Sequence, residues 1–307
     1  MFRLICGRLL GAIPTLMAIV LLGFVLMRLA PGGPFDAERA LPPEVEAQLR
    51  AQYDLDAPLH EQLARYLADL ARFDLGPSFK YKDFTVAELI RDGAGVSAAL
   101  GGAALVLAAA LGLTLGCAAA LKRGSRFDAA VMTLAVSGQV IPTFVMGPIL
   151  ALVFGLWLRW LPLAGWGGGR PAFLILPVIT LALPYVAAIA RLMRASLIET
   201  MNESYIRTAR AKGASPARIL LCHALPPALL PVVSYLGPAA AGLLTGSVVV
   251  ETIFGLPGIG RYFVQGAINR DYTLVLGVVM LYGGLIVVFN LATDLIYGWL
   301  DPRVRRS

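Results

Sequence analysis

Six long stretches of this chain contain no Asp, Glu, Lys or Arg, and they constrain its fold more than any other feature. They are Leu9–Met27, Gly93–Leu121, Ala129–Leu158, Pro171–Ala190, Ala224–Val250 and Tyr272–Thr293. A helix needs about 20 apolar residues to cross the hydrocarbon core of a bilayer, and a helix satisfies its own backbone groups there. The short alternating strands of a membrane β-barrel are absent from the sequence. We therefore predict an all-α integral membrane protein with six transmembrane helices.

The composition agrees with a membrane protein. Charged residues make up 15% of the 307 residues, against about 25% in soluble domains, and the mean hydropathy is +0.75. The net charge of +7 fits the basic cytoplasmic loops of a membrane protein better than a nucleic-acid-binding surface.

Basic residues gather on alternating connections and indicate the topology. The N-terminus, the second and fourth connections and the C-terminus carry most of them: Arg3, Arg8, Lys122, Arg123, Arg126, Arg191, Arg194, Arg207, Arg210, Lys212, Arg218, Arg303, Arg305 and Arg306. Since cytoplasmic loops are enriched in Lys and Arg, both termini are predicted to lie in the cytoplasm. Arg28-Leu-Ala-Pro31 is a poor signal-peptidase site, so the first stretch is interpreted as an uncleaved span.

The first connection, residues 30–92, is long and lies outside by this topology. We predict a small helical insert there within one transmembrane domain over residues 1–307. One short helix is expected over Glu44–Tyr53 and a second, amphipathic helix after Asp56–Pro58. Thr85 and Glu88 have the spacing of a capping box before a third short helix.

The fourth connection, residues 196–225, predicts a helix, a break and a second helix. Glu199–Lys212 suits a helix that Gly213 ends in the left-handed conformation. Ser215 is a good N-cap and Pro216 a good first helical residue. Such an elbow is either a lever that a partner protein grips or an amphipathic loop on the lipid surface, and spacing alone leaves both open.

This elbow resembles the loop pattern of ABC importer permeases. Arg207-Thr208-Ala209, Gly213 and Leu225-Pro226 take the positions of that pattern, although Arg207 replaces an acidic residue and His223 an isoleucine. The Arg-Thr-Ala-Arg-Ala-Lys-Gly form is similar to the dipeptide, oligopeptide and nickel branch. The resemblance implies that the following residues couple the chain to an ATPase: Arg207, Thr208, Ala209, Gly213, Ser215, Pro216, Leu225 and Pro226.

The outer segments resemble the B-type permease subunit of oligopeptide importers. The similar segments are Pro31–Asp36, Leu41–Pro43, Leu75–Val86, Glu251–Gly260 and Arg270–Tyr272. The resemblance implies a multi-pass protein of the bacterial inner membrane and a pore-forming subunit that is not itself an enzyme. It implies peptide import, with nickel, glutathione or murein peptides as alternatives.

The implied partners are a second homologous permease, two ABC ATPase subunits and an extracytoplasmic substrate-binding protein. ATP and Mg²⁺ would be bound by the ATPases, and this chain would bind no cofactor. Indeed, no phosphate-binding Gly-x-x-x-x-Gly-Lys-Ser/Thr motif occurs in the sequence.

Other site types find little support in the sequence. His60-Glu61 lacks the second histidine of a zinc-protease motif because position 64 is Ala, and Cys6, Cys117 and Cys222 lack metal-like spacing. The uncharged span interiors argue against an ion-coupled carrier, which keeps ionisable residues in the membrane.

Polar residues inside the spans either line a pore or bond to a neighbouring backbone. They are Ser137, Gln139, Thr143, Ser234, Thr245, Ser247 and Asn290. A cluster of prolines, Pro226, Pro227 and Pro231, predicts a hinge or a static bend at the start of the fifth span.

Overall fold

The computed structural model describes residues 2–29, 56–81, 83–245 and 247–300. Those residues form helices joined by short loops. The chain divides into two compact units, one of residues 1–6, 98–256 and 285–307 (unit 1) and one of residues 7–97 and 257–284 (unit 2). The helix expected over Glu44–Tyr53 lies outside the described residues.

Five helical stretches in the described residues are long and apolar enough to cross a membrane. They are Leu10–Arg28 of α1 (Phe2–Leu29), α4 (Val86–Leu121), α7 (Pro171–Met201), Leu230–Phe254 over α11 (Leu230–Thr245) and α12 (Ser247–Phe254), and Tyr272–Ile296 of α14 (Tyr272–Leu300). A bent pair of helices supplies the sixth. The predicted all-α membrane fold is therefore confirmed.

The third span is broken rather than continuous. Helix α5 (Arg126–Val140) ends at Ile141, and α6 (Thr143–Leu150) continues into a π-helix over Ala151–Trp157. The two halves are bent by 106°. Ile141 is extended, at φ −78° and ψ 118°, because the ring of Pro142 disfavours the helical conformation in the residue before it.

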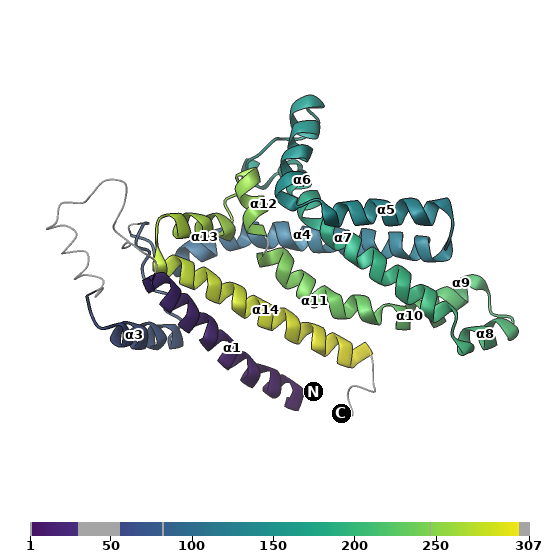
Figure 1. Cartoon of the computed structure of the whole chain (residues 1–307), viewed down its shortest axis with the longest axis horizontal. Coiled ribbons are helices and arrows are strands. Elements are labelled where there is room, and N and C mark those ends of the chain that lie inside the picture. The colour runs from purple at the N-terminus through teal and green to yellow at the C-terminus, as the bar shows by residue number, and fades with distance from the viewer. Residues whose placement is uncertain (1, 30–55, 82, 246, 301–307) are drawn as a thin grey trace. The chain divides into compact units, whose positions relative to one another are not determined.

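Within unit 1, α7 is the central helix. Helices α5, α6, α11 and α12 all contact it (Figure 1), and its middle turns are buried. Gly112 and Gly116 let α4 approach it closely. A Cβ on Gly116 would lie 2.5 Å from the carbonyl oxygen of Ala190, and one on Gly112 would lie 2.6 Å from the Cβ of Ile189. This Gly-x-x-x-Gly spacing is a common way of packing membrane helices.

Unit 2 contains most of the insert together with α13 (Ile259–Ile268), a helix that the sequence did not predict. Its apolar core consists of Val86, Leu89, Ile90, Ile259, Leu274 and Val278. Helix α3 (Leu59–Ala71) confirms the amphipathic helix expected after Asp56–Pro58.

The capping box before α4 is also confirmed. Glu88 accepts hydrogen bonds from the Thr85 amide (2.8 Å) and hydroxyl (2.9 Å), and the Glu88 amide donates to that hydroxyl at 3.3 Å. The separate short helix expected after this box is wrong, because α4 runs on without a break for 36 residues. No proline or left-handed glycine interrupts it.

Candidate functional site

The cytoplasmic elbow begins with α8 (Ser204–Ala211), which ends in a Schellman motif. The Ala214 amide donates to the Ala209 carbonyl at 3.2 Å and the Gly213 amide to the Arg210 carbonyl at 2.9 Å. Gly213 has φ +78°, the left-handed conformation that this motif requires and that glycine adopts without strain. Gly213 therefore terminates the helix as the sequence predicted.

The second half of the elbow starts with a capped turn. Ser215 is the N-cap of α9 (Pro216–Arg218), and its hydroxyl accepts a hydrogen bond from the Arg218 amide at 3.4 Å. Pro216 occupies the first helical position, where its missing N–H costs nothing. The chain then continues through a π-helix over Ile219–Ala224 into α10 (Leu225–Ala228).

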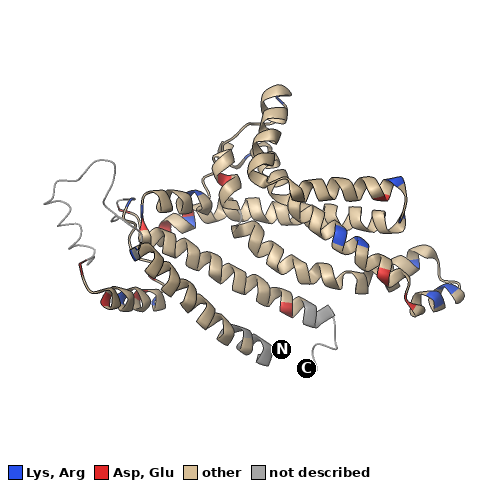
Figure 2. Cartoon of the chain, viewed as in Figure 1, with Lys and Arg blue, Asp and Glu red and all other residues tan. Residues whose placement is uncertain are grey.

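Helix α8 packs against this π-helix. Ile206 is fully buried and Ala209 nearly so, as are Ile219 and Ala224 of the π-helix. The opposite side of the elbow is exposed and basic, with Arg207, Thr208, Arg210, Lys212 and Arg218. Figure 2 shows Lys and Arg gathered on this elbow. An apolar inner side thus holds two segments together while the basic outer side is exposed.

The structure gathers part of the predicted coupling set. Arg207, Thr208, Gly213, Ser215 and Pro216 share the exposed side of the elbow, and Ala209 packs beneath it. Half-buried Leu225 and exposed Pro226 begin α10, on the far side of the π-helix. The single helix expected over Glu199–Lys212 is wrong: α7 ends at Met201, and α8 begins at Ser204.

Within unit 2, a buried carboxylate joins two segments that the sequence predicts to lie outside the membrane, Leu75–Val86 and Arg270–Tyr272. Asp271 is fully buried. It accepts hydrogen bonds from the Ser78 hydroxyl, the Lys80 amide (3.1 Å) and the Leu274 amide (3.1 Å). It thereby caps the start of α14 and fixes the loop that precedes α4.

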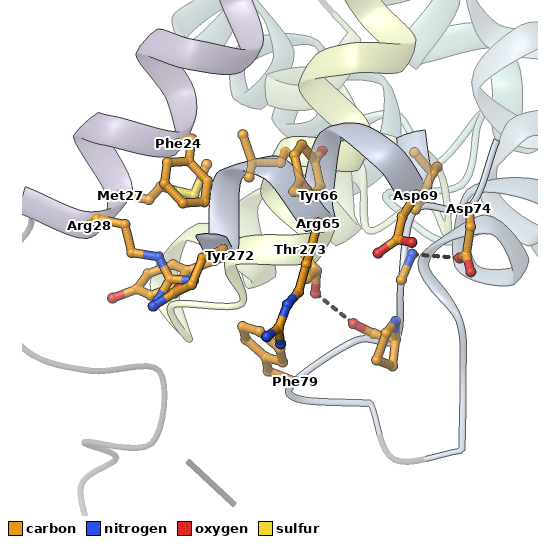
Figure 3. Close-up of a pocket in the computed structure, with 15 residues that line it drawn as sticks. Phe24, Met27, Arg28, Arg65, Tyr66, Asp69, Asp74, Phe79, Tyr272 and Thr273 are labelled. Atoms are coloured by element: carbon orange, nitrogen blue, oxygen red, sulfur yellow. Dashed lines mark hydrogen bonds between the residues drawn. The ribbon is translucent and has the colours of Figure 1, made fainter. Parts of the chain in front are cut away.

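A cavity of about 270 Å³ lies beside this cluster, and Figure 3 shows the labelled side chains of α1, α3 and α14 around it. The Arg28 guanidinium lies 5.4 Å from the ring centroids of both Phe24 and Tyr272, within cation–π range. The Tyr66 hydroxyl is buried and lacks a hydrogen-bond partner among the described residues, and burial raises its pKa to about 12.

Most of the polar residues predicted as pore candidates bond to their own helix. The hydroxyls of Ser137, Ser234 and Thr245 each donate to the carbonyl four residues earlier. Gln139 differs, because its side-chain oxygen accepts a hydrogen bond from Arg191 of α7. Near it, Arg194 forms a two-pronged ion pair with Asp128, at 2.6 and 2.7 Å.

Ionisable residues lie just beyond two of the uncharged runs predicted as spans, within helices that continue past those runs. Glu251 lies inside the span Leu230–Phe254, is fully buried and accepts a hydrogen bond from the Ser247 hydroxyl at 2.6 Å. Arg191 lies inside α7. Both were missed because each predicted span ended where its uncharged run ended, whereas a helix continues through charged residues.

A chain whose described residues form up to six apolar helical spans is a polytopic membrane protein. The family of binding-protein-dependent transport system inner membrane components matches residues 112–306, and the chain belongs to this family. It is thus an inner-membrane component of such a transport system.

The chain is similar over nearly its whole length to named permeases. It is 51% identical to the oligopeptide transport system permease protein OppB of Haemophilus influenzae and 52% identical to that of Salmonella typhimurium, each over 99% of this chain and 100% of the relative. It is 43% identical to the dipeptide transport system permease protein DppB of Bacillus subtilis, over 95% of this chain and 94% of the relative.

Solved structures share the fold. An inward-facing structure of the MetNI methionine ABC transporter has a TM-score of 0.59 at 20% identity and covers 69% of this chain and 96% of that chain. An amino acid ABC transporter has a TM-score of 0.56 at 16% identity, covering 69% of this chain and 94% of that chain. The type I importer permease fold predicted from the sequence is therefore confirmed.

Proposed function

We propose that the chain is a pore-forming permease subunit of an ATP-driven importer that carries peptides across the inner membrane. The elbow is the observation that carries this proposal: its sequence follows the permease loop pattern, and its geometry suits a lever. The relatives with 51–52% identity are named oligopeptide permeases, whereas the dipeptide relative is 43% identical. This difference favours oligopeptides over dipeptides as the substrate class, and nickel, glutathione and murein peptides are the alternatives within the same branch.

The elbow would receive movement from an ATPase subunit. In the proposal, the ATPase docks on the exposed side formed by Arg207, Thr208, Gly213, Ser215 and Pro216. Because Ile206 and Ala209 are packed against the π-helix, a push on α8 moves that segment too. Movement then passes through Leu225 and Pro226 into α10 and α11 and switches the pore between two states.

The proposed assembly contains a second homologous permease, two ATPases and an extracytoplasmic binding protein. Exposed polar residues on α5, namely Thr133, Ser137 and Gln139, support a shared pore, because such side chains in a membrane normally face protein or water rather than lipid. ATP and Mg²⁺ would be bound by the ATPases, where hydrolysis occurs.

The first test is purification of the tagged chain from its native cell in mild detergent. We expect one similar six-span permease and ATPases with phosphate-binding loops to co-purify. The assembly is then placed in liposomes with its binding protein, and ATP-dependent uptake of a tripeptide pool is measured. A folded chain that purifies alone and moves peptide without ATPases would contradict the proposal and favour a carrier.

Gly213 allows a sharper test of coupling. A Cβ at this position would meet no atom within 4 Å, so only its φ of +78° is sensitive to substitution. Gly213→Asn retains the left-handed conformation, whereas Gly213→Val does not. We expect Gly213→Val to lower the amount of peptide transported per ATP hydrolysed and Gly213→Asn to preserve it. Equal coupling in both variants would contradict the proposed lever.

A further inference from the structure

Arg191 of α7 and Gln139 of α5 form a polar contact inside unit 1. The Arg191 guanidinium donates a hydrogen bond to the side-chain oxygen of Gln139. One turn further along α7, Arg194 is neutralised by Asp128. The two arginines therefore differ: one belongs to an ion pair and the other is bonded to a neutral amide.

The Arg191 side chain is directed toward Gln139 and hence back along α7 toward its N-terminal end. In an α-helix, the stretch from Pro171 to Arg191 rises about 30 Å, the thickness of the hydrocarbon core, so the topology predicted from the sequence puts Arg191 at the inner boundary. A Cβ on Gly138 would lie 3.5 Å from the carbonyl oxygen of Leu183, so the neighbouring Gln139 lies near that level. Eight residues along α7 rise about 12 Å. The guanidinium thus reaches inward from Arg191 toward Gln139.

This direction argues against a simple anchoring role. An arginine that serves only to mark the cytoplasmic boundary snorkels toward water. Side chains on a helix lean toward its N-terminus, which for α7 is the outer end and for α5 the cytoplasmic end. Arg191 and Gln139 therefore lean toward each other, and the resulting contact places a positive charge below the membrane boundary.

The guanidinium retains unused hydrogen-bonding capacity. It carries several N–H donors in a planar fork that suits a carboxylate. Arg191 forms no ion pair with any described residue, and Gln139 is exposed on its helix. A positive charge at membrane depth is stabilised when an anionic group approaches it.

We propose that Arg191, together with Gln139, forms a binding site for the C-terminal carboxylate of the peptide during its passage. This inference rests on the proposed function as a peptide importer. The guanidinium binds the carboxylate through paired hydrogen bonds, as arginine commonly does. Gln139 accepts a hydrogen bond from the guanidinium and thereby orients it.

The test compares two peptide pools with the complete importer in liposomes. One pool contains tripeptides without Asp or Glu, and the other contains the same tripeptides as C-terminal amides. Uptake of each is measured by mass spectrometry for wild type, Arg191→Gln and Arg191→Lys. We expect Arg191→Gln to lower the acid-to-amide uptake ratio roughly tenfold, the effect of losing a hydrogen bond to a charged group. Arg191→Lys should restore part of the ratio.

Arg170→Gln is the matched control, because Arg170 is an exposed arginine at the opposite end of α7. It should leave the acid-to-amide ratio at its wild-type value. The binding protein is the same in every assay, so its own preference cancels between variants. An unchanged ratio in Arg191→Gln, with the importer assembled and taking up peptide, would overturn the inference. If wild type imports neither pool, the proposed function itself fails.

Discussion

Gly116 of α4 determines how closely two helices of unit 1 pack. A Cβ at Gly116 would lie 2.5 Å from the Ala190 carbonyl oxygen and 2.8 Å from the Cβ of Met193, whereas ordinary contact begins at 3.4 Å. Relief of the shorter contact would need about 0.9 Å of separation, enough to lose much of the dispersion energy of the neighbouring atoms. Overpacking of this kind costs about 1–3 kcal/mol.

The experiment compares Gly116→Ala with Gly102→Ala. Gly102 is also on α4, and a Cβ there would meet no atom within 4 Å. Alanine is favoured over glycine in a helix by about 0.5–1 kcal/mol at both positions, so that contribution cancels in the comparison. We expect Gly116→Ala to be less stable than Gly102→Ala by about 1–3 kcal/mol.

The measurement is SDS denaturation of the purified protein in mixed micelles, followed by tryptophan fluorescence. Wild type and both variants are compared at the same detergent concentration. Equal unfolding midpoints for Gly116→Ala and Gly102→Ala would refute the close approach of α4 and α7. A Gly116→Ala variant more stable than wild type would refute it more strongly, because the higher helix propensity of alanine would then outweigh any steric clash with α7.

Three further predictions concern the cytoplasmic half of unit 1. Ser215→Ala should destabilise the start of α9 by about 1 kcal/mol, seen as faster amide exchange over residues 216–224, and Ser215→Asp should not. Asp128→Asn should lower the SDS unfolding midpoint, because it leaves Arg194 without its ion pair, and adding Arg194→Gln should recover part of the loss; simple additivity of the two changes would argue against the pair. Replacing Pro227 and Pro231 with Ala should slow transport if this segment is a hinge, and unchanged uptake would exclude the hinge.

The sequence predicted features that depend on local chemistry. Uncharged runs located the spans, and glycine and serine preferences located the Schellman motif at Gly213 and the cap at Ser215. These features depend on residues within one or two turns of each other, so their physical causes are contained in short segments. The role of the elbow in coupling stays a prediction.

Features that depend on contacts between distant segments were missed. The direction of Arg191 depends on Gln139, 52 residues earlier in the chain, and no local pattern encodes that partner. The length of α7 was underestimated because its last turns are charged, yet their backbone hydrogen bonds continue through Met201. Pro142 accounts for the break in the third span, but the 106° angle depends on how both halves pack.

The buried Asp271 also sets the order in which the outer segments become structured during synthesis. Ser78 lies 193 residues before its hydrogen-bonding partner. At about 5–20 residues per second, the ribosome needs roughly 10–40 s to make the intervening chain. Until the last span begins to emerge, the loop before α4 cannot form this contact, and its polar groups must be satisfied by water or by other proteins. The loop before α4 therefore reaches its final structure only when α14, the last span, is inserted.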